Sequence, residues 1–245
     1  MAVTAFALIL GGTILGAVVR SKLPEHHLTG DSKEVIRLAT ALVATLTALV
    51  LALLFAATRA SFEHTSASVS RLATDISELD DVLEEYGPEG TAIRKQLRNE
   101  MGPLIDAMWR DDAIAAGRAA PARPKHNSRA LSMLRDLQPK TPAQASLHTR
   151  ALQISTDIQQ TRLGQFAQPP DSVSTPFMIV LVLWMVFLFT TFSMSAKPNA
   201  TLAIVLFVCI LSASAAIYLI LELGLPFGGL MQVSNDSLRE ALTPL

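Results

Sequence analysis

The sequence has few charged residues and a single cysteine, and each shortage narrows the class of protein. Only 17% of the 245 residues are charged, against about a quarter in a typical soluble domain. Because Cys209 is the one cysteine, a disulfide framework or a cysteine-based metal cluster within one chain is excluded. The net charge of -1 gives no basic field that would attract nucleic acid, so no nucleic-acid partner is expected.

The charges are missing from four blocks, and this uneven distribution indicates a membrane protein. A helix of about 20 apolar residues crosses the hydrocarbon core of a bilayer. The four uncharged, apolar runs cover residues 2–19, 38–57, 177–192 and 200–221. Since backbone groups in lipid must pair internally, all four runs are predicted to be helices. Nothing basic precedes the first run, which favours a retained helix over a signal peptide.

The predicted fold class is an all-α integral membrane protein, with four transmembrane helices in two pairs flanking a helical soluble domain. Residues 59–171 hold 14 of the 20 Lys/Arg and 15 of the 21 Asp/Glu, which is an ordinary soluble composition. The predicted boundaries are 1–60 for helices 1 and 2, 61–171 for the water-exposed domain, 172–223 for helices 3 and 4, and 224–245 for a C-terminal tail.

The second transmembrane helix has no sequence signal to stop at the membrane surface, because glycine and proline are absent between Asp31 and Tyr86. One helix is therefore predicted from about residue 33 to residue 86, extending out of the membrane. Its distal part carries an apolar seam at alternating spacings of three and four: Val69, Leu72, Ile76, Leu79, Leu83 and Tyr86. This seam fits either a core within the chain or identical helices of neighbouring subunits.

Shorter helices are predicted in the rest of the middle domain. One begins at about Thr91, after a Gly-Pro break, and should be kinked or interrupted at Gly102-Pro103. A loop is predicted from Gly117 to Ser128, and Ser128 can cap the helix that follows it. Thr141 starts a capping box, so a further helix begins there.

Gly12 and Gly16 in the first span form a GxxxG pair. Such a pair allows two membrane helices to approach closely, which favours a packing seam over a chance pair in a span rich in small residues.

A candidate pore surface lies on the second helix. Hydroxyl side chains followed by bulky apolar ones fall near one face of it: Thr40, Thr47, Leu51, Phe55, Thr58 and Phe62. This pattern is typical of a wet vestibule leading to a hydrophobic constriction, which gates by dewetting. The alternative is ordinary packing, with each threonine bonding to its own backbone.

An acidic stretch lies near the end of the same helix, and it includes Asp75, Glu78, Asp81 and Glu85. In an oligomer these carboxylates could form a ring that attracts cations; the alternative is a solvated helix face. P-loop, GxSxG and HExxH motifs are absent, so no enzyme activity, catalytic residue, metal or cofactor is predicted.

Several segments together resemble the bacterial bestrophin-like family. They are Arg94, Leu97-Arg98, Met108-Trp109, Arg150-Ala151-Leu152, Thr161-Arg162-Leu163 and the run from Leu221 to Gly229. The family has a similar acidic-x-Pro-Phe-x-Gly ending, which maps here onto Glu222, Pro226, Phe227 and Gly229, with three residues between the acid and the proline. The resemblance covers residues from about Pro24 to Leu242.

The resemblance implies a homo-oligomeric ion channel, a pentamer as in the bestrophins, that conducts anions through a pore lined by the second helix. It also implies a multi-pass protein of the bacterial inner membrane with a cytosolic middle domain, although the loop charges give almost equal counts for the two orientations. The implied partners are the lipid bilayer, further copies of the chain and inorganic ions. The alternative is a non-conducting membrane scaffold whose soluble domain binds a partner protein.

Overall fold

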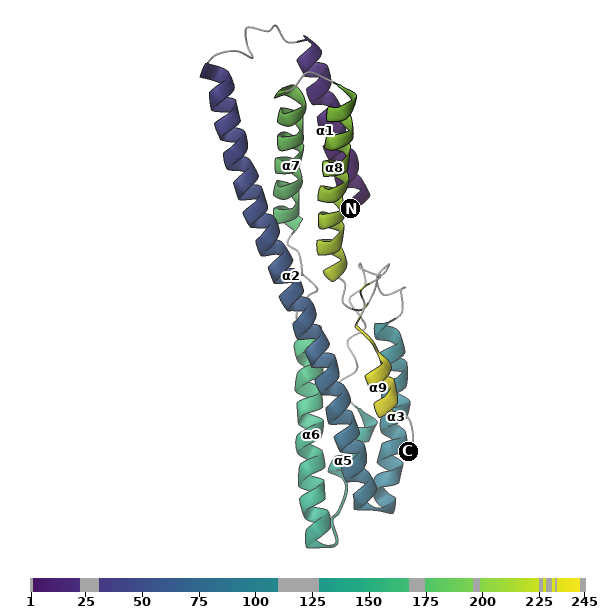
Figure 1. Cartoon of the computed structure of the whole chain (residues 1–245). Helices are drawn as coiled ribbons and strands as arrows, with labels where there is room; N and C mark the ends of the chain where they lie inside the picture. The colour runs from purple at the N-terminus through teal and green to yellow at the C-terminus, as the bar shows by residue number, and fades with distance from the viewer. Residues whose placement is uncertain are drawn as a thin grey trace. The chain divides into compact units, whose positions relative to one another are not determined.

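The structure, a computed structural model, describes residues 2–22, 31–109, 128–167, 175–195, 199–224, 227, 231 and 233–242, and its regular elements are all α-helices (Figure 1). The chain divides into two compact units. Unit 1 comprises Met1–Ser61 and Asp171–Gly224, and unit 2 comprises Phe62–Pro170 and Leu225–Leu245. Helix α2, Asp31–Tyr86, contributes to both units. The predicted long helix is thus confirmed.

Unit 1 contains the four apolar helices that the sequence predicts. They are α1 (Ala2–Lys22), the first part of α2, α7 (Thr175–Ser195) and α8 (Ala200–Leu223), and each is long and apolar enough to cross a membrane. Large apolar side chains remain exposed on all four, including Leu8, Leu42, Phe177 and Phe207. Exposed apolar surface on this scale suits helices that face lipid.

Helix α1 packs closely along α7 at its two GxxxG glycines. Gly12 and Gly16 are buried, and the hydroxyl of Thr190 on α7 donates to the carbonyl of Gly12 at 3.0 Å. A Cβ at Gly16 would lie 2.4 Å from the backbone oxygen of Thr190, whereas a Cβ at Gly11 would meet nothing within 4 Å. The absence of a side chain at Gly16 therefore sets the distance between these two helices.

Replacing Gly16 by alanine should lower the stability of unit 1, by about 1–3 kcal/mol, because a methyl group forced into a packed interface displaces a backbone that cannot rotate away. Gly11→Ala, in the same helix, should be neutral or slightly stabilising. The thermal midpoint of the detergent-solubilised chain measures both. Equal midpoints for the two variants would show that α1 can shift away from α7 at no cost.

Unit 2 is built around the distal part of α2. The helices with it are α3 (Pro88–Met108), α5 (Arg129–Arg135), α6 (Pro142–Ala167) and α9 (Asp236–Ala241). The six residues of the apolar seam on α2 are all buried, and five of them share one core with residues of α3, α5, α6 and α9. Of the two interpretations that the seam allowed, the structure shows the core within the chain.

Local capping signals were accurate guides to the helix starts. The Ser128 hydroxyl accepts from the amide of Leu131 at 3.2 Å, and the Thr141 hydroxyl accepts from the amide of Gln144 at 3.1 Å. Helix α3 begins at Pro88, about three residues before the predicted start, and it is not interrupted at Gly102-Pro103. Met101 and Ile105, on either side of Pro103, are both buried in the core, and this packing holds the helix together. The predicted loop, apart from Ser128, lies outside the described residues.

Candidate functional site: the faces of helix α2

The three threonines of the predicted pore surface face the interior of the chain. Thr40, Thr47 and Thr58 are each buried. Their hydroxyls donate to backbone carbonyls one turn earlier in α2, those of Ile36, Val43 and Leu54. Such bonds satisfy a hydroxyl in an apolar environment without a partner helix.

The three bulky residues of the same prediction are placed differently from one another. Leu51 is half-buried against the core of unit 1, and Phe62 is half-buried against the core of unit 2. Phe55 is 48% exposed. Among the six predicted lining residues, Phe55 is thus the one whose side chain is largely accessible on a single chain.

A second stripe runs along α2 about a third of a turn away from the threonine face, and sequence reasoning did not single it out. Its members are all exposed, recur at spacings of three and four, and are small or hydrophilic: Ala41, Thr45, Ala48, Ala52, Ala56, Arg59, Glu63, Ala67, Ser70, Thr74, Ser77 and Asp81. Residues 18 positions apart are separated by about five full turns of helix and therefore lie on the same side of it. Arg59 is thus on the same side of α2 as Ala41, and Glu63 is on the same side as Thr45. We call this set the outer stripe.

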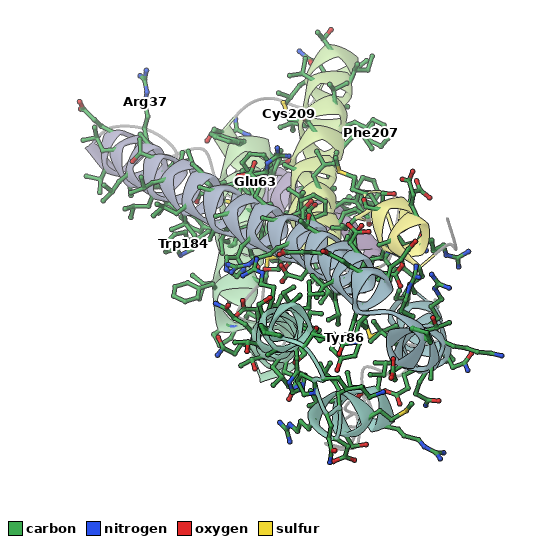
Figure 2. All side chains as sticks on the ribbon, turned by 90° about the horizontal axis from the view of Figure 1, so that it is seen from below. Arg37, Glu63, Tyr86, Trp184, Phe207 and Cys209 are labelled. Carbon is green, nitrogen blue, oxygen red and sulfur yellow. The ribbon has the colours of Figure 1, made fainter. Side chains whose placement is uncertain are left out.

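A third, leucine-rich face lies beside the outer stripe within the apolar part of α2. Leu38, Leu42, Leu46, Leu49 and Leu53 are all exposed there. These large side chains suit contact with lipid, whereas a run of alanines offers lipid little apolar area. The helix therefore presents two chemically distinct exposed faces over its membrane-length portion. Arg37, near the start of this portion, is exposed and extends away from the ribbon of α2 (Figure 2).

The four acidic residues predicted to form a ring in an oligomer are placed differently from one another within the chain. Glu78 accepts from Nε of Arg150 on α6 at 2.8 Å and pairs with its terminal nitrogen as well. Asp75 is half-buried, and its Oδ2 has no hydrogen-bond partner among the described residues. Asp81 and Glu85 are exposed. Within the described part of the chain, no group of three or more His, Cys, Asp or Glu side chains is arranged to hold a metal ion.

A neighbouring acid, Asp80, makes a largely buried ion pair in unit 2. Asp80 is 8% exposed and accepts from Nε and a terminal nitrogen of Arg94 at 2.9 and 2.5 Å. Arg98 approaches the same carboxylate at 3.3 Å, and Arg94 also pairs with Glu84 at 2.8 Å. This cluster joins α2 to α3. The sequence shows the acidic run, but no local pattern identifies the arginines that pair with it.

The C-terminal family motif reaches the core of unit 2. Phe227 packs edge-to-face on Trp109, with ring centroids 5.2 Å apart, and the Trp109 indole donates to the carbonyl of Val233 at 2.7 Å. Leu238 is fully buried. The segment that the sequence indicated only as a tail is therefore part of unit 2. Glu222 is buried at the end of α8, and Pro226 and Gly229 lie outside the described residues.

A carboxylate on α3 holds the start of α5. Glu100 accepts from the Ser128 hydroxyl at 2.6 Å, from the amides of Arg129 and Ala130 at 2.9 and 3.2 Å, and from the Gln96 side chain at 2.9 Å. Partial burial acts to raise its pKa, but these four hydrogen bonds outweigh burial and hold the pKa below its usual value. Beside it lies a cavity of about 50 Å³, which has room for a few water molecules.

Glu100→Gln should destabilise unit 2 by about 1–3 kcal/mol at pH 7. The side-chain amide nitrogen of glutamine is itself a donor, so it cannot accept the hydrogen bonds that one carboxylate oxygen of Glu100 now accepts. Because the folded-state pKa is lowered, the carboxylate contributes stability above its unfolded pKa, and this contribution is lost as the pH falls through the folded value. The difference in thermal midpoint between wild type and variant should therefore narrow on acidification. Glu85→Gln, an exposed acid, is the control; a pH-independent difference for Glu100→Gln would contradict the argument.

The comparison with known families covers nearly the whole chain. Residues 7–238 match the Bestrophin-like domain. The chain belongs to the bestrophin-like family. Searches of curated proteins and of solved structures return no match. Membership of this family, together with the four apolar helices, identifies the chain as a membrane protein, and bestrophin-family proteins are typically anion channels.

Proposed function

We propose that this bestrophin-like protein is a homo-oligomeric ion channel that conducts anions, with helix α2 lining the pore. Family membership supports the class of activity. We expect a pentamer in a bacterial inner membrane, with unit 2 in the cytosol. In such an assembly several copies of α2 surround one axis, and one of the two exposed faces of α2 is available to line a lumen.

The outer stripe of α2 is the observation that carries this proposal. A helix that only anchors a protein is surrounded by lipid, and large apolar side chains are then expected on every exposed face. In α2 the leucines occupy one face, while every member of the outer stripe, from Ala41 to Asp81, is alanine, threonine, serine or a charged residue. Small side chains leave room for water along the axis of an oligomer, and hydroxyl and charged groups solvate ions.

The proposal is tested by flux from the purified full-length chain in liposomes. Chloride release above that of empty liposomes is expected, and its absence across several ions and pH values would favour the non-conducting scaffold instead. Phe55→Ala should raise the flux several-fold, because an exposed aromatic ring at the edge of the outer stripe acts as a hydrophobic constriction. Leu51→Ala, one turn earlier, should have a smaller effect in the same direction.

Phe207→Ala is the matched control for Phe55→Ala. Phe207 on α8 is 50% exposed, so both substitutions remove an accessible phenyl ring from a membrane helix. Only the Phe55 variant should change flux.

Thr47→Val, which removes a buried hydroxyl, tests the threonine face of α2 separately. A change in flux in Thr47→Val, with no change in Phe55→Ala, would assign the lumen to the threonine face.

A further inference from the structure

The charges on the outer stripe have a specific order. Leu38 to Thr58 is uncharged, and the first charged residue that follows on α2 is Arg59. Glu63 comes next on the same stripe, four residues and therefore about 6 Å further along the axis. Both side chains are exposed, and each also has an interaction partner within the chain. The stripe is thus neutral through the apolar part of α2, then positive, then negative.

We propose that Arg59 is the residue that selects anions in this channel and that Glu63 opposes it. This inference rests on the proposed function, because it needs copies of α2 around a common axis. Any rotational symmetry converts one exposed arginine on a lining helix into a ring of guanidinium groups. Rings of Arg or Lys favour anions, and rings of Asp or Glu favour cations. Arg59 adjoins the apolar run, where an ion is least hydrated by bulk water, so its ring has the larger effect.

The charge–ion interaction has a predictable size. At about 6 Å and the dielectric constant of water, one unit charge changes the local concentration of an ion by about threefold. A ring of several charges acts on the same ion, and a narrow pore lowers the effective dielectric constant. A change of at least about threefold in the chloride-to-potassium permeability ratio is therefore expected when the charge of Arg59 is removed.

The test measures reversal potentials across planar bilayers that contain the full-length protein in a potassium chloride gradient. Arg59→Gln should lower the chloride-to-potassium permeability ratio, and Glu63→Gln should raise it. Arg59→Lys should retain the wild-type ratio, because it keeps the charge. Size-exclusion chromatography of each variant verifies that assembly is unchanged.

Arg71→Gln is the control on the same helix. Arg71 is exposed and lies 18 residues after Leu53, in line with the leucine face rather than with the outer stripe. An unchanged ratio in a conducting Arg59→Gln channel would overturn the inference, as would an equal shift in Arg71→Gln or a loss of selectivity in Arg59→Lys. A wild-type protein that conducts no ion would instead overturn the proposed function, so the two failures are distinguishable.

Discussion

Gly90→Ala should destabilise unit 2 by about 3 kcal/mol or more, because the new methyl group has no space to occupy. A Cβ at Gly90 would lie 2.0 Å from the carbonyl oxygen of Leu83 and 3.0 Å from its carbonyl carbon. These are backbone atoms of α2, which cannot move aside as a side chain can. Gly90 therefore allows α3 to fold back directly against the end of α2.

Gly102→Ala is the matched control, since Gly102 lies in the same helix, α3, and a Cβ there would meet nothing within 4 Å. Alanine favours helix over glycine by about 0.5–1 kcal/mol, so this variant should be neutral or slightly stabilised. Trp109 and Trp184 are the two tryptophans of the chain. Unfolding of unit 2 is therefore followed by Trp109 fluorescence in a Trp184→Phe background. Equal midpoints for the two glycine variants would contradict the proposed close approach.

The turn that precedes Gly90 illustrates how far local sequence determines this fold. The run of 54 residues without glycine or proline between Asp31 and Tyr86 predicts α2 almost to its ends. Gly87-Pro88 predicts the turn after it, although α3 begins at Pro88, three residues before the predicted start at about Thr91. Gly87 has φ of 112°, a conformation that glycine adopts without strain. Helix existence, caps and turns depend on near neighbours in sequence, and they could be predicted from it.

The candidate site was only partly predictable, because its placement depends on contacts between distant residues. Periodicity alone shows that Thr40, Thr47 and Thr58 share a face of α2, but it does not show whether that face is turned toward the chain or away from it. The docking of Phe227 and Val233 on Trp109 joins residues more than 100 positions apart. No local pattern encodes either fact, so both required the packed structure.

The second large effect is expected at Asp80. Asp80→Ala removes the carboxylate that Arg94 and Arg98 share and leaves two guanidinium groups without it in a partly buried site. Removing one member of a buried ion pair costs about 3–5 kcal/mol, since the remaining charge is poorly solvated. Fluorescence of Trp109 during thermal or urea unfolding measures this loss.

Glu78→Gln gives the contrasting case on the same helix. Glu78 and Arg150 are 40% and 49% exposed in their side chains, and an exposed pair of this kind contributes only about 0.2–1 kcal/mol. A loss at Asp80 no larger than that at Glu78 would show that water reaches the Asp80 cluster.

The double variant Asp80→Leu/Arg94→Met separates the energy of the pair from the cost of an orphaned charge. Replacing both partners by apolar side chains of similar size should recover much of the stability that Asp80→Ala loses, with Arg98 able to turn toward solvent.

Because α2 runs without a break from unit 1 into unit 2, a double variant with full stability also tests whether the Asp80 cluster affects ion conduction. If the Asp80 cluster also holds α2 at a fixed rotation about its axis, the double variant should fold normally but alter chloride flux. If the cluster only stabilises unit 2, chloride flux through the double variant should be unchanged.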